Sequence, residues 1–180
     1  MVFEKSENHE RKKGIVLFIN FPIHSIDPER SCMMMDPIVQ KVDELFAAGY
    51  RWTESVLLSV SESKNIQSEL LSKIGSGFCG GISRTQGTCG AVIGAVMALN
   101  MFFGRNEPSV PLDQCYPPVQ KFVHWFEERF GSTNCTTLID CDLSTKEGLH
   151  KFIQGNILAT CKNITSETIG RVLNILDEKI

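Results

Sequence analysis

The sequence lacks the patterns that would identify several common classes of protein. It has no pair of cysteines in a C-x-x-C spacing, the usual signature of zinc ribbons and thioredoxin-type redox sites. No serine, histidine and aspartate set or carboxylate pair has a spacing that specifies hydrolytic chemistry. Basic stripes with interleaved aromatics are absent and the net charge is −3, which excludes a nucleic-acid partner. The apolar run at 89–103 is shorter than the roughly 20 residues of a membrane-spanning helix.

The chain combines an ordinary globular composition with many cysteines. Its 180 residues are 42% hydrophobic and 22% charged, which predicts one soluble domain. The seven cysteines are an odd number, and a core of this size needs no disulfide scaffold. The apolar run at 14–21 is too short for an export signal, and Pro22 and His24 follow it at once. We therefore expect a cytoplasmic protein whose thiols are reduced or bind a metal.

The spacing of apolar residues predicts an all-α fold, a compact multi-helix bundle formed by residues 36–180. Asp36 and Pro37 suit the cap and first position of its first helix, which Gly49 ends. Residues 1–35 are interpreted as a separate N-terminal arm, with residues 14–21 as a candidate strand. Further helices are expected from residue 51, over 67–74, from a Thr88 cap to 103, and over 119–130, 135–139, 145–161 and 165–178.

A glycine-rich loop precedes the predicted central helix. Gly75, Gly77 and Gly80 spell G-x-G-x-x-G, the dinucleotide-binding fingerprint. The segment before them has helical rather than strand character, so the context of that fingerprint is missing. We interpret these glycines as the means to form a tight, closely packed loop.

The central helix itself is predicted to pack closely and to carry a thiol at its start. Gly90, Gly94 and Ala98 form one edge of small residues, along which another backbone can approach. Cys89 lies near the first backbone N–H groups, where the helix dipole favours a thiolate. The sequence therefore predicts a reactive or metal-binding cysteine beside a tight helix contact.

Four segments resemble one known family in their order and spacing. They are VDELFAAGYRWTESV (42–56), GGISRTQGTCGAVIGAVMAL (80–99), FEERFGSTNCTTL (126–138) and the cysteine at 161 with Asn163 and Ile164 after it. Together, over about residues 37–177, they are similar to the redox-active family named for its C_GCAxxG_C_C cysteine pattern. The resemblance implies a helical domain with cysteines gathered at one site, related to the cysteine-rich domain of split-Soret cytochromes, where an iron–sulfur site lies beside haem. The sequence has no C-x-x-C-H motif, so covalent haem attachment is not supported.

The resemblance also assigns site residues. Three of the family's four cysteines match positions in this chain, namely Cys89, Cys135 and Cys161. At the fourth position this chain has Trp52, whose indole nitrogen is a donor only and cannot replace a thiolate ligand. A four-thiolate site therefore needs another contributor. Cys79 is the first candidate, followed by Cys141 and then Cys115.

The resemblance and the cysteines together predict a redox-active, metal-binding protein that holds an iron–sulfur cluster on Cys89, Cys135, Cys161 and Cys79. Zinc binding, or thiol–disulfide exchange with Cys89 as a low-pKa nucleophile, is one alternative. A member without metal that acts as a helical binding or oligomerisation module, through residues 1–35, is another. A redox partner protein and a homo-oligomer are expected as candidate partners, without nucleic acid or membrane. The sequence identifies no catalytic residue and no reaction.

Overall fold

The computed structural model describes residues 28–178, and most of that range is helical. The helices are α1 (Pro28–Ala47), α2 (Trp52–Ser63), α3 (Leu70–Ser76), α4 (Cys79–Ile82), α5 (Gly90–Phe103), α6 (Tyr116–Phe130), α7 (Cys135–Ile139), α8 (Lys146–Gln154) and α9 (Ile157–Asp177), with a 3-10 turn, η1, at Leu112–Gln114. Residues 28–178 contain no strand but one isolated β-bridge, so the predicted all-α class is confirmed. The candidate strand at 14–21 lies outside the described residues.

The first helix begins earlier than the sequence predicts. It starts at Pro28, so Pro37 lies inside the helix rather than at its first position. Proline removes one backbone N–H from the helical hydrogen bonds, and the helix continues through that loss. Helix α1 therefore crosses residue 35, where the N-terminal arm was expected to end. Gly49, with a φ of 100°, follows the helix end as predicted.

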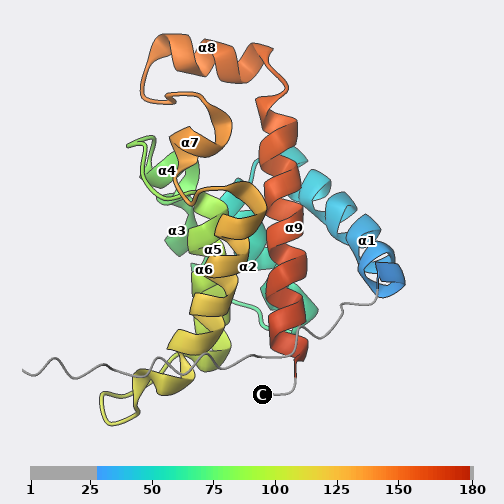
Figure 1. The fold of residues 1–180 in the computed structure, drawn as a ribbon, viewed down its shortest axis with the longest axis vertical. Coiled ribbons are helices and arrows are strands. Elements are labelled where there is room, and N and C mark those ends of the chain that lie inside the picture. Colours follow the sequence, from blue (N-terminus) through green and yellow to red (C-terminus); the bar gives the residue numbers. More distant parts are fainter. Residues whose placement is uncertain (1–27, 179–180) are drawn as a thin grey trace, which may run out of the picture.

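Helix α5 is the centre of the bundle and packs against α2, α6 and α9 (Figure 1). Its small-residue edge faces α2, because a Cβ added at Gly94 would lie 2.9 Å from the Thr53 carbonyl oxygen. Thr53 is fully buried, and its hydroxyl donates a 2.9 Å hydrogen bond to the Gly90 carbonyl. The predicted close approach is confirmed. The largest fully buried side chains of this core are Leu99 of α5 itself and, around it, Leu57, Phe122, Phe126 and Ile169.

Helix α6 is the amphipathic helix that the sequence predicts, with one extra turn at its start. Phe122 and Phe126 are fully buried against the core, and Val123 and Phe130 are partly buried beside them. Gly131 follows with a φ of 82°, a left-handed conformation that glycine adopts without steric cost and that ends the helix.

The last two helices divide differently from the prediction. We expected a break between residues 161 and 165, but α9 runs unbroken from Ile157 to Asp177. The hydroxyls of Thr165 and Ser166 do not cap a new helix. They donate back to the carbonyls of Cys161 and Lys162, at 2.8 and 3.0 Å, as such side chains do inside helices. Cys161 therefore lies near the start of a long helix rather than at the end of a short one.

The shorter elements gather at one end of the bundle. Helices α4, α7 and α8 lie where α5 and α9 begin, at the top of Figure 1. Helices α7 and α8 make few contacts with the rest of the bundle. None of the helices within residues 28–178 has the length and apolar character needed to cross a membrane.

Candidate functional site

The glycine-rich loop turns left-handed immediately before α5. Residues 80–84 all have positive φ, between 53° and 72°, and backbone N–H groups from Ile82 and Ser83 donate to the carbonyls four residues earlier. Three of the five are not glycine, and each such residue costs about 1–2 kcal/mol in this region. Strain of this kind persists only where the surrounding structure enforces it. The tight loop predicted from the sequence is confirmed.

The left-handed turn at residues 80–84 places the backbone of Gly81 against Cys135. A Cβ added there would lie 2.7 Å from the Cβ of Cys135, closer than real Cβ atoms approach. The carbonyl of Gly81 accepts hydrogen bonds from the N–H groups of Thr85 and Gly87, at 3.1 and 3.0 Å. The turn therefore holds bare backbone directly against one of the cysteines that the family resemblance assigns.

A single antiparallel bridge joins the starts of α5 and α7. It pairs Thr88 with Asn134. The Cys89 N–H donates to the Thr133 carbonyl at 2.8 Å, and the Cys135 N–H donates to the Gly87 carbonyl at 2.9 Å. Cys89 is the residue before α5 and Cys135 the first residue of α7, so the bridge fixes two cysteine-bearing helix starts side by side. Successive side chains alternate across an extended backbone, which places both cysteines on the same side of the bridge.

The α5 cap differs by one residue from the prediction. Cys89, not Thr88, occupies the cap position, and its side chain makes no capping hydrogen bond. At α7 the expected cap is confirmed, because the Asn134 side chain accepts a 3.0 Å hydrogen bond from the Thr137 N–H. Asn134 also donates through Nδ2 to the Gln86 carbonyl, which ties α7 to the strained turn.

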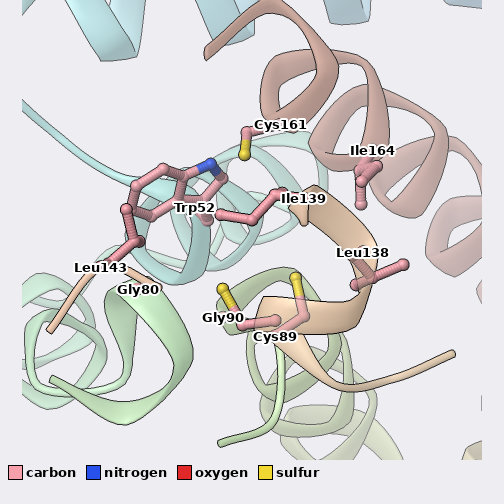
Figure 2. A pocket seen from close by; sticks show the side chains of 10 residues that line it. Trp52, Gly80, Cys89, Gly90, Leu138, Ile139, Leu143, Cys161 and Ile164 are labelled. Carbon is pink, nitrogen blue, oxygen red and sulfur yellow. The ribbon is translucent and has the colours of Figure 1, made fainter. Parts of the chain in front are cut away.

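Three of the four predicted ligands line one small cavity. Its lining residues are Trp52, Gly80, Cys89, Gly90, Cys135, Leu138, Ile139, Leu143, Cys161 and Ile164. Figure 2 shows the sulfur of Cys89, at the start of α5, and that of Cys161, on α9, on opposite sides of this space. The cavity measures about 10 Å³, the lower limit for a single water molecule. The structure thus brings cysteines at 89, 135 and 161 to one place, as the resemblance implies.

Trp52 forms part of the same wall. Its ring makes edge-on contacts with Phe46 and Phe152, with centroids 6.0 and 6.2 Å away. In Figure 2 its indole nitrogen points toward the sulfur of Cys161. The Nε1 atom is buried, yet it has no hydrogen-bond partner of acceptable geometry among residues 28–178.

Burial keeps these thiols protonated. Burial first, and the neighbouring thiols to a lesser extent, raise the pKa of Cys135 and of Cys161 from 9.0 to about 12. The nearby indole of Trp52 lowers the pKa of Cys161, but by less than burial raises it. For Cys89 we expected the opposite shift. The backbone N–H groups of Ala91 and Val92 do lower its pKa, but desolvation outweighs them and the net pKa is raised.

The three candidates for the fourth ligand, Cys79, Cys141 and Cys115, lie outside the cavity lining. Cys79, the fourth predicted ligand, is half-buried at the start of α4, where its thiol points toward the Gly75 carbonyl at 4.0 Å. Cys141 packs in a small apolar cluster with Cys135 and Cys161, but its thiol donates to the Gly148 carbonyl at 2.9 Å. A role for either as fourth ligand stays a prediction.

Cys115 is the most distant of the three candidates. Its thiol donates a 2.9 Å hydrogen bond to Asn100, near the end of α5 opposite Cys89. A helix of that length spans about 20 Å. Within the described part of the chain, no three side chains of histidine, cysteine, aspartate or glutamate are grouped closely enough to hold a single metal ion.

The fold and the cavity define an all-helical protein with a buried cluster of thiols. Residues 50–175 match the family described as "Putative redox-active protein (C_GCAxxG_C_C)", and the chain belongs to that family. No curated protein and no solved structure matches the chain. Family membership supports a redox-related role.

Three parts of the site have no signal in the sequence. The resemblance marks position 52 only as a missing cysteine and does not indicate that an indole N–H is buried there. The pairing of Thr88 with Asn134 joins residues far apart in the chain with no strand pattern around either. The glycines predict a tight loop, but the left-handed conformation of Ile82, Ser83 and Arg84 is set by the surrounding structure.

Proposed function

We propose that the redox centre of this protein is an iron–sulfur cluster held by Cys89, Cys135 and Cys161. The observation that carries the proposal is that the cap of α5, the first residue of α7 and helix α9 each contribute one thiol to a single cavity. The other described residues of its lining are glycine, aliphatic residues and Trp52, with no carboxylate or imidazole among them. Such a donor set suits soft metal ions and iron–sulfur clusters, which thiolates bind.

The chemistry of these thiols fits a cluster as their occupant. Because each thiol is protonated near neutral pH, cluster binding would release protons as the thiolates form. Iron would then supply the positive charge that the apolar lining lacks, and electrons would be stored on the cluster rather than on the protein. The backbone N–H groups of Ala91 and Val92, at the start of α5, are directed toward the Cys89 sulfur, which favours an anionic assembly there.

The size of the cavity sets a condition on this proposal. At about 10 Å³ it is far smaller than a cluster, so loading requires part of the lining to move outward. Leu138 and Ile139 of α7, and Leu143 after it, are the lining residues on the least firmly packed elements. We expect the segment from α7 to α8 to be the part that adjusts.

Zinc is the less favoured occupant. A zinc ion needs its sulfur ligands at about 2.3 Å, so all of them must converge on one point. The described residues contain no such grouping. A cluster of several iron and sulfide atoms is broader than one ion, and its ligands need not meet so closely.

The test is anaerobic reconstitution of the full chain with iron and sulfide, followed by metal analysis and visible absorption. Wild-type protein should become brown, with roughly equal iron and sulfide. Cys89→Ala should lose most of both. Cys115→Ala is the matched control, because it removes a buried thiol at the other end of α5 and should load normally.

Two results would contradict the proposal. One is wild-type protein that stays colourless and iron-free under these conditions, which would leave thiol exchange or a binding module as the function. The other is equal loading of the two alanine variants. Cys79→Ala and Cys141→Ala are compared in the same assay to identify the fourth ligand. The variant that lacks this ligand should lose more iron than the other.

A further inference from the structure

We propose that the indole N–H of Trp52 donates a hydrogen bond to the sulfur of Cys161 when that sulfur is a metal-bound thiolate. The inference rests on the proposed function, since it concerns the loaded state of the same centre. It gives Trp52 a role as a positioning residue that tunes the metal centre without ligating it.

The first support is the unsatisfied N–H. Nε1 of Trp52 is buried and finds no partner of acceptable geometry among the described residues. Leaving a buried donor unpaired costs about 1–3 kcal/mol, so such groups are rare unless something else pairs with them. Figure 2 places this nitrogen toward Cys161, across the cavity from Cys89. The direction of the N–H therefore identifies the missing acceptor as a group at or near that sulfur.

The second support is that the direction of the indole is fixed in advance. Phe46 and Phe152 contact the ring edge-on, at interplanar angles of 84° and 74°. The start of α2 is held in place as well. The Arg51 N–H donates a hydrogen bond to Glu54 Oε2 at 2.9 Å, and the Thr53 hydroxyl donates one to the Gly90 carbonyl. An indole in contact with two aromatic rings cannot easily rotate to find another partner.

The third support is the difference between a thiol and a thiolate as acceptor. A neutral thiol accepts hydrogen bonds weakly, whereas hydrogen bonds to charged groups are shorter and roughly twice as strong. The N–H is thus poorly matched to Cys161 in the metal-free protein and well matched to it after a metal binds. This explains why a donor is placed where the family pattern has a ligand.

The expected consequence is a change in reduction potential. A hydrogen bond to a ligand sulfur stabilises the more negative, reduced state of a cluster more than the oxidised state. Removal of that bond should therefore lower the potential without removing a ligand. Trp52→Phe makes this change, because phenylalanine keeps an aromatic ring in contact with Phe46 and Phe152 but has no N–H.

The experiment uses the full chain in two forms. Cd²⁺ serves as a diamagnetic probe, because it binds one or two thiolates and does not need all the cysteines to converge on one point. The indole N–H resonances are followed by NMR as it is added. The chain has only two tryptophans, so Trp125→Phe assigns the signal of Trp52. Iron–sulfur reconstitution of wild type, Trp52→Phe and Trp125→Phe then gives iron content and midpoint potential. Trp125 packs against Phe122 and Phe130, away from the cavity lining, and its variant is the matched control.

Binding of Cd²⁺ should move the Trp52 indole proton downfield and leave Trp125 unchanged. Trp52→Phe should bind as much iron as wild type at a lower potential, and Trp125→Phe should match wild type in both. If metal binds while the Trp52 resonance stays in place, the inference is overturned and the proposed function stands. If the protein binds neither iron nor Cd²⁺, both the proposed function and the inference about Trp52 are overturned. If Trp52→Phe does not fold, the NMR result on the Trp125→Phe background still decides the question.

Discussion

Gly81 is the residue at which the backbone conformation and the site depend on each other most directly. Its φ of 72° and the 2.7 Å approach to the Cys135 Cβ both require the absence of a side chain. Gly81→Ala should lower the free energy of unfolding by about 2–4 kcal/mol, from left-handed strain and overpacking combined. Urea denaturation of the metal-free protein measures this change.

Gly77→Ala is the control for Gly81→Ala. Gly77 has a φ of −69°, and a Cβ there would meet nothing within 4 Å among the described residues. Alanine at such a site is neutral or stabilises by about 0.4–1 kcal/mol. If the two variants unfold at the same urea concentration, the Gly81 backbone does not lie in tight contact with the Cys135 side chain.

At the same scale, the sequence grouped three cysteines that the structure also brings together, but it gave Cys89 the wrong ionisation. The family pattern assigned the cysteines at 89, 135 and 161 to one site, and they line one cavity. The thiolate expected at Cys89 followed from its place at a helix start, which is a local property. Burial depends on what α7 and α9 place around the thiol, and no local pattern contains that information.

At the scale of elements, the cap of α7 has a structural and a functional consequence. Asn134→Ala removes both the cap to Thr137 and the bond from Nδ2 to Gln86. A lost cap costs about 1 kcal/mol. Because the same residue holds the start of α7 against the strained turn, we expect the variant to bind less iron on reconstitution as well.

Thr145→Ala separates these two consequences. Thr145 caps α8 by accepting a 2.9 Å hydrogen bond from the Gly148 N–H, and it is absent from the cavity lining. Its loss should cost a similar amount of stability and leave iron loading unchanged. Equal loading by the alanine variants at 134 and 145 would show that the α7 cap has no particular importance for the site.

Element boundaries show where local sequence signals are ambiguous. Thr165 and Ser166 have the chemistry of caps, but their hydroxyls bond to carbonyls of the same helix, so α9 continues. Pro37 similarly suits a first position but lies within α1. Asn134 was identified correctly, because asparagine is a preferred cap residue and its side chain accepts from the Thr137 N–H. In each case the competing conformations differ by about 1 kcal/mol, which tertiary packing readily overrides.

For the whole molecule, the buried thiols predict how stability depends on pH. The pKa of Cys135 and of Cys161 is about 12 in the folded protein, against 9.0 when exposed. Between these values the folded state binds more protons than the unfolded state, so the free energy of unfolding falls as pH rises above 9. Below pH 9 these two groups contribute no pH dependence.

Urea unfolding of the reduced, metal-free protein at pH 8 and pH 10 tests this expectation. Wild type should be less stable at pH 10, and Cys135→Ala should lose less stability between the two conditions. A variant that loses as much as wild type would indicate that the Cys135 thiol is more exposed to water than the structure shows.

The all-α class and the central, closely packed α5 were predictable for the whole molecule, because helical periodicity and the edge formed by Gly90, Gly94 and Ala98 are visible in the sequence. The geometry of the cavity was not. It depends on the bridge between Thr88 and Asn134, on the left-handed turn, and on the place of Cys161 within α9, each of which results from contacts between distant segments.

That bridge has a consequence for comparing this chain with other members of its family. Two backbone hydrogen bonds set how far apart the cysteines at 89 and 135 lie, and of the positions between these cysteines in the chain only Thr133 takes part in either bond. Insertions or deletions in the hairpin formed by α5, η1 and α6 can therefore alter the interval in the sequence without shifting either sulfur. Relatives should preserve the backbone bridge that pairs the starts of these two helices. A motif search that requires a fixed number of residues between the cysteines will overlook family members that keep the bridge but differ in that number.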